Sequence, residues 1–257
     1  MARENPISRI ESSLTDQLVV EARAELPDDT RLAFEENIPP EELQYWSLVE
    51  ESLAEGNMVL HELRDKGSHE LLSARLMVYY DARHDNEPAF ILAAWSVTPD
   101  APPHGQDSLR GKGKGFGSYL LHRSVAYILE NHPEVFAIVS ERESAISTNQ
   151  TVQRAQRARW HQVNGFCSVQ DFPYEIPAFT PYECSEKYMA VYERPSVPVP
   201  GELLILRMDG QKILPGSILI SIVERIYHWG YDIKYTDPYM SQRMSLIEPA
   251  RTYLLKD

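Results

Sequence analysis

The sequence predicts an α/β (α+β) fold in which helices flank a mixed, mostly antiparallel sheet. Three strand-like runs lie close together between residues 57 and 97, and Gly, Asn, Asp and Pro fill the turns between them. A glycine-rich turn then leads into an amphipathic helix over 118–133. Strand-like and helical runs alternate after this helix as far as residue 194. The order indicates an antiparallel meander followed by strand–helix units.

The other elements follow from hydrophobic periodicity and from turn residues. Residues 1–27 are mixed and polar, and we expect a loosely packed lead-in segment there. The remaining elements are expected in this order: a weak strand at 30–37, a helix at 41–56, a strand at 135–143, a helix at 147–164, and strands at 166–175 and 187–194.

The proline-rich stretch 195–201 is interpreted as a domain boundary. It separates a main domain, 28–195, from a C-terminal α/β extension, 196–257. The extension is too small for an ample core of its own, so we expect it to pack on the main domain or on a partner subunit in a homodimer. Its helix at 217–230 has an apolar face expected to point inward, formed by Leu219, Ile222, Val223, Ile226 and Trp229.

Composition and charge restrict the function classes. The net charge is -13, which disfavours binding to nucleic acid or to an anionic membrane surface and suits a cationic substrate. The two cysteines lack the spacing of a zinc site, so no metal is expected, and they fit a reduced cytoplasmic setting. No run of 18 apolar residues and no signal-peptide pattern occurs, so no membrane span is expected.

The glycine-rich turn KGKGFG, Lys112 to Gly117, is the strongest functional signal. The first amides of a helix have no acceptors inside it and attract phosphate together with the helix dipole. Glycines let the backbone approach an anion closely, and two lysines add positive charge. The lysine of a P-loop is missing before Ser118, and the strands upstream form a meander instead of a dinucleotide-binding βαβ unit. The remaining alternative is a flexible glycine loop without a ligand.

Two motifs together resemble those of the GNAT superfamily of acyl-CoA-dependent N-acyltransferases. The turn at 112–117 is similar to its (Gln/Arg)-x-x-Gly-x-(Gly/Ala) signature, with Lys112 in the first position. The segment 159–166, Arg-Trp-His-Gln-Val-Asn-Gly-Phe, is similar to the family's Arg-Trp-Tyr-x-x-x-Gly-Phe segment. The resemblance covers about residues 28–194, and the order of elements agrees with it.

The resemblance implies a sheet splayed at its centre, between its fourth and fifth strands, with acyl-CoA in the gap. The pantetheine would pair with the fourth strand and the pyrophosphate would bind the turn before the helix. The implied cofactor-binding residues are Trp95, Ser96, Val97, Thr98, Lys112, Gly113, Lys114, Gly115, Phe116, Gly117 and Ser118.

Direct attack by an amine on a thioester needs a base for the amine and an acid for the leaving thiolate. His161 occupies the position of the family's acidic tyrosine, and it is the candidate acid; a histidine that only packs there is the alternative. Glu141 and Glu143 are candidate bases, because strand alternation places both on one face near the implied gap. The alternative is that they are surface charges at the end of a strand. Several aromatic residues could also line an acceptor pocket, namely Tyr79, Tyr80, Trp95, Tyr174 and Tyr182.

The sequence therefore predicts an enzyme that transfers an acetyl or other short acyl group from acyl-CoA to a primary amine, in a small molecule or a peptide, within a ternary complex. The alternative is a module of the same fold that binds CoA without turnover.

Overall fold

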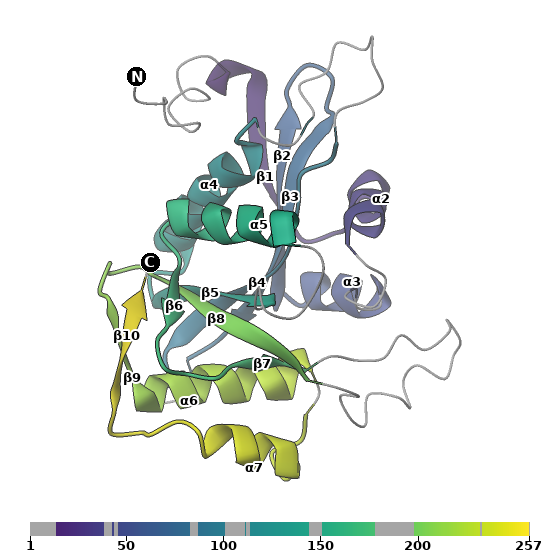
Figure 1. Cartoon of the computed structure of the whole chain (residues 1–257). Coiled ribbons are helices and arrows are strands. Elements are labelled where there is room, and N and C mark those ends of the chain that lie inside the picture. The colour runs from purple at the N-terminus through teal and green to yellow at the C-terminus, as the bar shows by residue number, and fades with distance from the viewer. Residues whose placement is uncertain are drawn as a thin grey trace, which may run out of the picture. The chain divides into compact units, whose positions relative to one another are not determined.

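The computed structural model describes residues 14–38, 43, 46–82, 87–100, 111, 114–143, 151–177, 198–231 and 233–256. The chain forms two compact units (Figure 1), one made of Met1–Tyr79 with Ala93–Pro133 and the other of Tyr80–Leu92 with Glu134–Asp257. The strands pair in the order β1-β2-β3-β4-β5-β8-β6-β10-β9, and β7 pairs with β8. β4 and β5 run parallel, whereas the pairs β1–β2, β2–β3, β5–β8, β6–β8, β6–β10 and β9–β10 are antiparallel. The expected mixed, mostly antiparallel sheet is confirmed.

The first unit contains the expected meander. It begins with the 3-10 turn η1 (Thr15–Gln17) and includes β1 (Leu18–Arg23), β2 (Met58–Asp65), β3 (Leu71–Tyr80) and residues 93–97 of β4 (Ala89–Val97). β1 pairs with β2 from Leu18↔Asp65 to Arg23↔Leu60. Because side chains alternate between the two faces of a strand, β2 carries Leu60 to one face and Leu63 to the other. Both leucines are fully buried, so each face of this part of the sheet packs against a separate core.

Helices cover both faces of these strands (Figure 1). α2 (Asp28–Asn37) and α3 (Trp46–Ala54) bury Phe34 and Val49 against Leu60 and Leu76. α4 (Phe116–Asn131) packs Phe116, Tyr119 and Leu120 against the other face. α4 is thereby fixed to the sheet through its own first turn.

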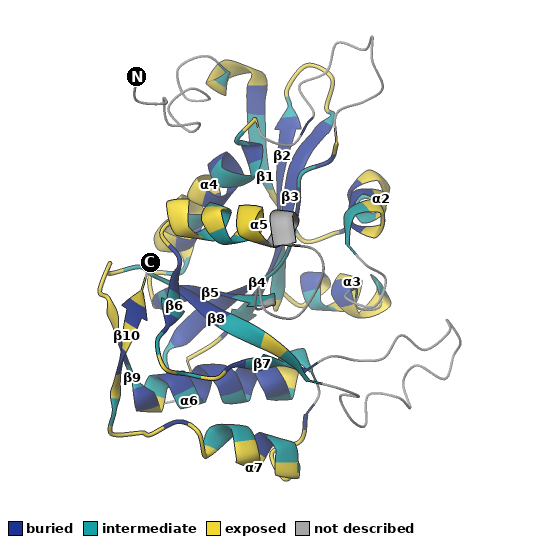
Figure 2. Cartoon of the chain, viewed as in Figure 1, coloured by how far each residue is buried: buried dark blue, intermediate teal, exposed yellow. Residues whose placement is uncertain are grey.

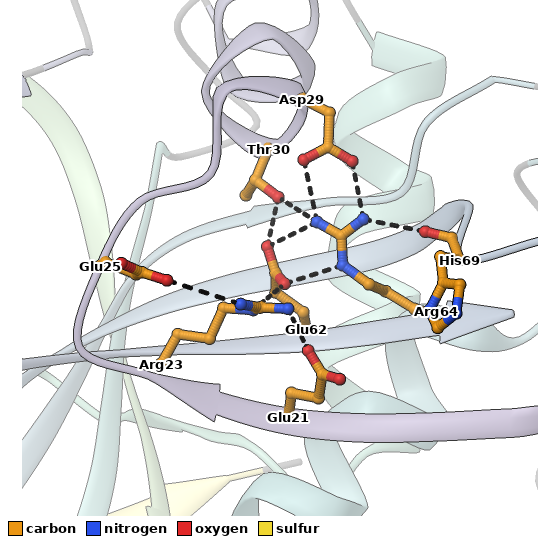
Figure 3. Close-up of polar contacts among 8 residues, drawn as sticks. All are labelled: Glu21, Arg23, Glu25, Asp29, Thr30, Glu62, Arg64 and His69. Carbon is orange, nitrogen blue, oxygen red and sulfur yellow. Dashed lines mark hydrogen bonds and ion pairs between the residues drawn. The ribbon is translucent and has the colours of Figure 1, made fainter. Parts of the chain in front are cut away.

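A buried charge network holds the start of α2 against β2 (Figure 3). Glu62 has no exposed surface, and its carboxylate accepts hydrogen bonds from Arg23 Nε at 2.6 Å, from Arg64 Nε at 2.9 Å and from the Thr30 hydroxyl. Arg64 also forms a two-pronged pair with Asp29 at 2.7 and 2.9 Å, which holds the pKa of that aspartate below its usual value. The network therefore joins β1, β2 and the first turn of α2.

The second unit is built around β5 (Val135–Glu143). β5 pairs in parallel with β4 over four β4 residues, Ala89 to Leu92, and the last pair is Leu92↔Val139. On its other side β5 pairs with β8 (Val199–Arg207) from Ala137↔Arg207 to Glu143↔Gly201. The other strands are β6 (Cys167–Val169), β7 (Glu175–Ile176), β9 (Ile213–Pro215) and β10 (Thr252–Lys256). Residues 140–143 of β5 thus continue beside β8 beyond the end of the ladder with β4.

Helices flank β5 and β8 on both sides in this unit (Figure 1). α5 (Thr151–Val163) lies on one side, and α6 (Gly216–Arg225) lies on the other. α6 is the more deeply buried of the two (Figure 2), with Leu219, Ile222 and Val223 fully buried. It continues as a π-helical turn, η4 (Ile226–Gly230), and α7 (Pro238–Met244) follows, with Asp237 capping its first turn through the Tyr239 amide at 2.8 Å.

The N-terminal expectations differ from the structure at two places. The segment 30–37 is part of helix α2 and not a strand, since Pro27 is extended before it and Asp28 and Asp29 occupy a first turn where acidic residues are favourable. The expected lead-in 1–27 contains β1, whose six residues pair with β2.

The C-terminal expectations also differ from the structure. Residues 199–207, assigned above to an extension after 195, form β8, which lies between β5 and β6 in the sheet. Proline is tolerated at the start of a strand as well as in a linker, so the proline-rich stretch is compatible with the start of β8. Trp229 is 56% exposed instead of buried, because the π-helical turn from Ile226 breaks the 3.6-residue period of α6. The expected strand at 187–194 lies outside the described residues.

Candidate active site

The start of α4 has the geometry of an anion-binding turn. Gly115, the residue before the helix, has φ 92° and ψ 1°, a left-handed conformation that favours glycine. The bond from the Tyr119 amide to the Gly115 carbonyl, 2.9 Å, closes the first turn, so the amides of residues 116–118 precede the regular helical ladder. The described first turn contains no acidic side chain, and Lys114 beside it is exposed. These residues fit a phosphate group.

Two of the expected cofactor-binding residues, Lys112 and Gly113, lie outside the described residues. Phe116 is buried in the core beneath α4, so its backbone and not its ring is available to a ligand. Gly117 and Ser118 are partly exposed in the first turn of the helix.

The expected pantetheine-binding residues lie at the end of β4 in the first unit. The Trp95 ring packs edge-on against Trp46 at 5.9 Å and near Phe34 at 6.1 Å. The Val97 carbonyl accepts a hydrogen bond from the Ser73 hydroxyl at 2.8 Å, and the Thr98 hydroxyl lies 3.2 Å from the Ser73 hydroxyl oxygen. Ser96 is exposed. The aromatic ring of Trp95 therefore contributes to the α2–α3 core. The expected pairing with pantetheine would then involve the backbone of β4 and not this ring.

Glu141 carries a carboxylate with a strongly raised pKa. Its Oε2 accepts a hydrogen bond from the Tyr231 hydroxyl at 2.9 Å, and its Oε1 accepts one from the Tyr174 hydroxyl. Burial raises the pKa of Glu141 from 4.5 to about 7, although both tyrosine hydrogen bonds act in the opposite direction. A carboxylate with a pKa near 7 is suited to take and return a proton at neutral pH.

His161 lies on the other face of β5. Its Nε2 is 3.4 Å from the hydroxyl of Ser140, and Ser140 and Glu141 are consecutive residues of the strand, so their side chains point to opposite faces. His161 Nδ1 is 2.9 Å from the Arg157 carbonyl, which can only accept a hydrogen bond, so Nδ1 carries the proton in the neutral ring. His161 can then donate a proton from Nε2 only as an imidazolium. The structure does not bring His161 and Glu141 together.

Glu143, the second candidate base, is the last residue of β5 and pairs with Gly201. Its side chain lies outside the described part of the structure. Strand alternation places it on the same face as Glu141, as the sequence predicted.

Sequence reasoning missed the tyrosines that hold Glu141. The sequence places Tyr174 only among possible pocket aromatics, and nothing in it points to Tyr231. Tyr231 is 90 residues away from Glu141 along the chain, and its contact depends on the π-helical turn before it. No pattern in the sequence indicates such a turn.

Two other features of the described residues bear on ligand binding. Among the described residues, no group of three His, Cys, Asp or Glu side chains could hold a metal ion. A surface hollow of about 430 Å³ beside the Glu62 network is lined by Arg23 and Arg64 together with Asp28 and Asp29. Charges of both signs line it, so it offers no uniform charge to a ligand.

Comparison with solved structures identifies the architecture. A Bacteroides thetaiotaomicron protein assigned to the GNAT family of acetyltransferases matches 79% of this chain and 90% of its own, with a TM-score of 0.51 and 17% identity. The chain has the GNAT fold. Spermidine N-acetyltransferase from Vibrio cholerae, in complex with CoA and spermine, matches 76% of this chain and 98% of its own, with a TM-score of 0.43 and 14% identity. Because that score is lower, the assignment of the fold rests on the first structure.

Neither a protein-family model nor a curated protein matches the sequence. In the described part of the chain, no helix has both the length and the apolar character needed to span a bilayer.

Proposed function

We propose that the protein is an acyl-CoA-dependent N-acyltransferase that moves an acetyl or other short acyl group to a primary amine. The observation that carries the proposal is the turn before α4, where left-handed Gly115 leads into a helix start without acidic side chains. The pyrophosphate of CoA is the anion that a chain with the GNAT fold would bind there. Lys112, Gly113, Lys114, Gly115, Gly117 and Ser118 would surround it, and the backbone of Trp95 to Thr98 would pair with the pantetheine.

The chemistry is direct aminolysis. Glu141 would take a proton from the attacking ammonium group, directly or through a water molecule, and the neutral amine would add to the thioester carbonyl. The nitrogen of the tetrahedral adduct would lose its second proton to water, and collapse of the adduct would then form the amide and release the CoA thiolate, which must gain one proton. His161, as an imidazolium, is the proposed source of that proton, and Glu143 is a second carboxylate that could serve as the base. The raised pKa of Glu141 supports its role, since a base needs a pKa near the working pH.

The net charge of -13 favours a cationic acceptor, so the proposed acceptors are amines that are protonated in solution, in small molecules or at peptide N-termini. The cytoplasm is the proposed compartment because only two cysteines occur in the chain. The proposal includes no metal, nucleic acid or membrane partner, and a homodimer remains the proposed assembly.

The test is release of free CoA thiol from acetyl-CoA in the presence of polyamines, aminoglycosides, amino acids or short peptides. Thiol release that depends on one amine class supports the proposal. No release from any of them, together with thermal stabilisation by CoA, would instead indicate the alternative of a CoA-binding module without turnover. If CoA thiol is not released and CoA does not stabilise the protein, both the acyltransferase and the CoA-binding module are refuted.

Gly115→Ala provides the specific test of the turn. The substitution introduces a side chain at φ 92° and should raise the KM for acetyl-CoA at least about tenfold, since a shifted turn loses amide contacts to phosphate. Gly56→Ala is the matched control, because Gly56 has φ 78° and no atom within 4 Å of an added Cβ, and it follows α3 far along the chain from the turn. Equal KM values for the two variants would contradict the role of the turn.

A further inference from the structure

The Glu141 carboxylate is held by hydroxyl groups from two segments that come later in the chain. Tyr174 belongs to the segment between β6 and β7, and Tyr231 follows directly after η4. Tyr174 is buried, and its ring lies 5.9 Å from that of Tyr227. The carboxylate oxygens thus each have one tyrosine donor.

The π-helical turn determines where Tyr231 lies. α6 passes into η4 without a break, and a π-turn places one extra residue in the helical ladder compared with an α-helix. The fully buried ring of Tyr227, inside η4, meets the Tyr231 ring edge-on at 6.3 Å. In a regular α-helix, which lacks the extra residue of the π-turn, the following residues would be rotated by about 100° around the helix axis. Tyr231 would then point away from Glu141.

Gly230 is the last residue of this turn and lies beside another tyrosine, Tyr80. A Cβ at this position would lie 3.5 Å from the Tyr80 hydroxyl, which is an ordinary contact distance. Tyr80 is buried and its ring stacks on Phe90 at 4.6 Å. The turn therefore lies beside the end of β3.

We propose that Tyr231 is a positioning residue for Glu141, and that the π-helical turn at the end of α6 delivers it. This inference rests on the proposed function, in which Glu141 is the base. The C-terminal part of the chain then positions the base through a hydrogen bond and does not itself touch the reacting atoms.

The groups around the carboxylate determine the direction of the effect. Tyr174 and Tyr231 donate to it, and Tyr80 from β3 and Tyr227 from η4 lie near enough for its charge to raise their pKa values. Among the described residues, no arginine or lysine contributes to the pKa of Glu141; Arg225 acts on Tyr80 instead. Loss of the Tyr231 hydroxyl removes a donor to the charged form and so raises the pKa of Glu141 further.

The test is Tyr231→Phe, with Tyr235→Phe as the matched control. Tyr235 is 45% exposed, and its ring contacts His228 at 4.1 Å instead of the Glu141 cluster. The Glu141 titration is followed by NMR of protein labelled with ¹³C at the glutamate side-chain carboxyl, and its signal is assigned by its loss in Glu141→Gln. This measurement needs no substrate and no turnover.

We expect a midpoint near 7 in the wild-type protein and in Tyr235→Phe, and a midpoint higher by about one pH unit in Tyr231→Phe, since a hydrogen bond to a charged group is among the stronger ones. An unchanged midpoint in Tyr231→Phe would overturn the proposal. If Tyr231→Phe fails to fold, Tyr231→Leu is measured in the same way with the same criterion.

The acidic limb of the pH profile of kcat/KM separates the two proposals. If the acidic limb moves together with the NMR midpoint, the result supports both the acyltransferase function and the positioning of Glu141 by Tyr231. An NMR midpoint that moves in a protein that acylates no amine supports the positioning of Glu141 and refutes the acyltransferase function. A limb that moves while the NMR midpoint stays fixed shows that Tyr231 acts on another group, and it overturns the positioning role alone.

Discussion

Replacing Glu141 with Gln should abolish turnover and, at the same time, stabilise the folded protein at alkaline pH. Gln has nearly the same shape, and its amide can still meet the hydroxyls of Tyr174 and Tyr231, which hold the carboxylate oxygens. It cannot take a proton from an amine. The variant therefore removes the base and the buried charge while keeping the packing.

The magnitude follows from the raised pKa. The difference between about 7 in the folded state and the ordinary 4.5 is about 2.5 pH units, and each unit corresponds to about 1.36 kcal/mol, which gives about 3.4 kcal/mol. Below pH 4.5 the group is protonated in both states and costs nothing. As the pH rises from 4.5 through 7 the unfolded chain loses its proton first, so the wild-type free energy of unfolding falls by this amount.

The assay is urea unfolding of both proteins at pH 4 and pH 9. The free energy of unfolding of the variant minus that of the wild type should rise by about 3 kcal/mol between these two pH values. Glu36→Gln, at an exposed position of α2, is the control and should show no such rise. If the difference in free energy of unfolding between the variant and the wild type stays constant with pH, ionisation of Glu141 does not destabilise the folded protein and the reasoning is refuted.

Three further perturbations test other parts of the structure. Glu62→Gln should lower the free energy of unfolding, measured in urea, by about 3 kcal/mol, because two guanidinium groups lose their buried counter-charge. Glu21→Gln, at a partly exposed carboxylate, is the control and should lower the free energy of unfolding by less than about 1 kcal/mol. Burial and Arg75 lower the pKa of His61 to about 4. Between pH 6.5 and pH 4, His61 is therefore protonated in the unfolded chain but remains neutral in the folded protein. Urea unfolding across this range should show a loss of about 3.4 kcal/mol that is absent in His61→Gln. His161→Ala should lower kcat at least about a hundredfold if His161 supplies the proton to CoA, and unchanged turnover would exclude that role.

Patterns that act over short distances in the sequence predicted much of the fold. The alternation in 57–97 identified β2, β3 and β4, and the apolar run from Val135 identified β5 with its observed bounds. Local patterns failed where tertiary pairing decides the structure. Leu18–Arg23 forms a strand because its backbone pairs with β2. Residues 199–207 form a central strand because their backbone pairs with β5 on one side and with β6 on the other.

The candidate site shows the same division. Gly115 was identified from its neighbours alone, since a glycine before an amphipathic helix has a local meaning. Glu141 was identified from its place on a strand, but the reason for its raised pKa was not visible. That reason is burial against tyrosines that lie 33 and 90 residues further along the chain.

The order of β5 and β8 has a consequence during synthesis. β5 ends at residue 143 and β8 begins at residue 199, so 56 further residues, 144–199, must leave the ribosome before the second neighbour of β5 even begins to emerge. At roughly 5–20 residues per second this takes about 3–11 s. Throughout that interval the apolar stretch 135–139 can be paired only by β4, and its opposite edge is open to strands of other nascent chains. Yield in a cell should therefore respond to translation rate and growth temperature more strongly than the stability of the finished protein would suggest.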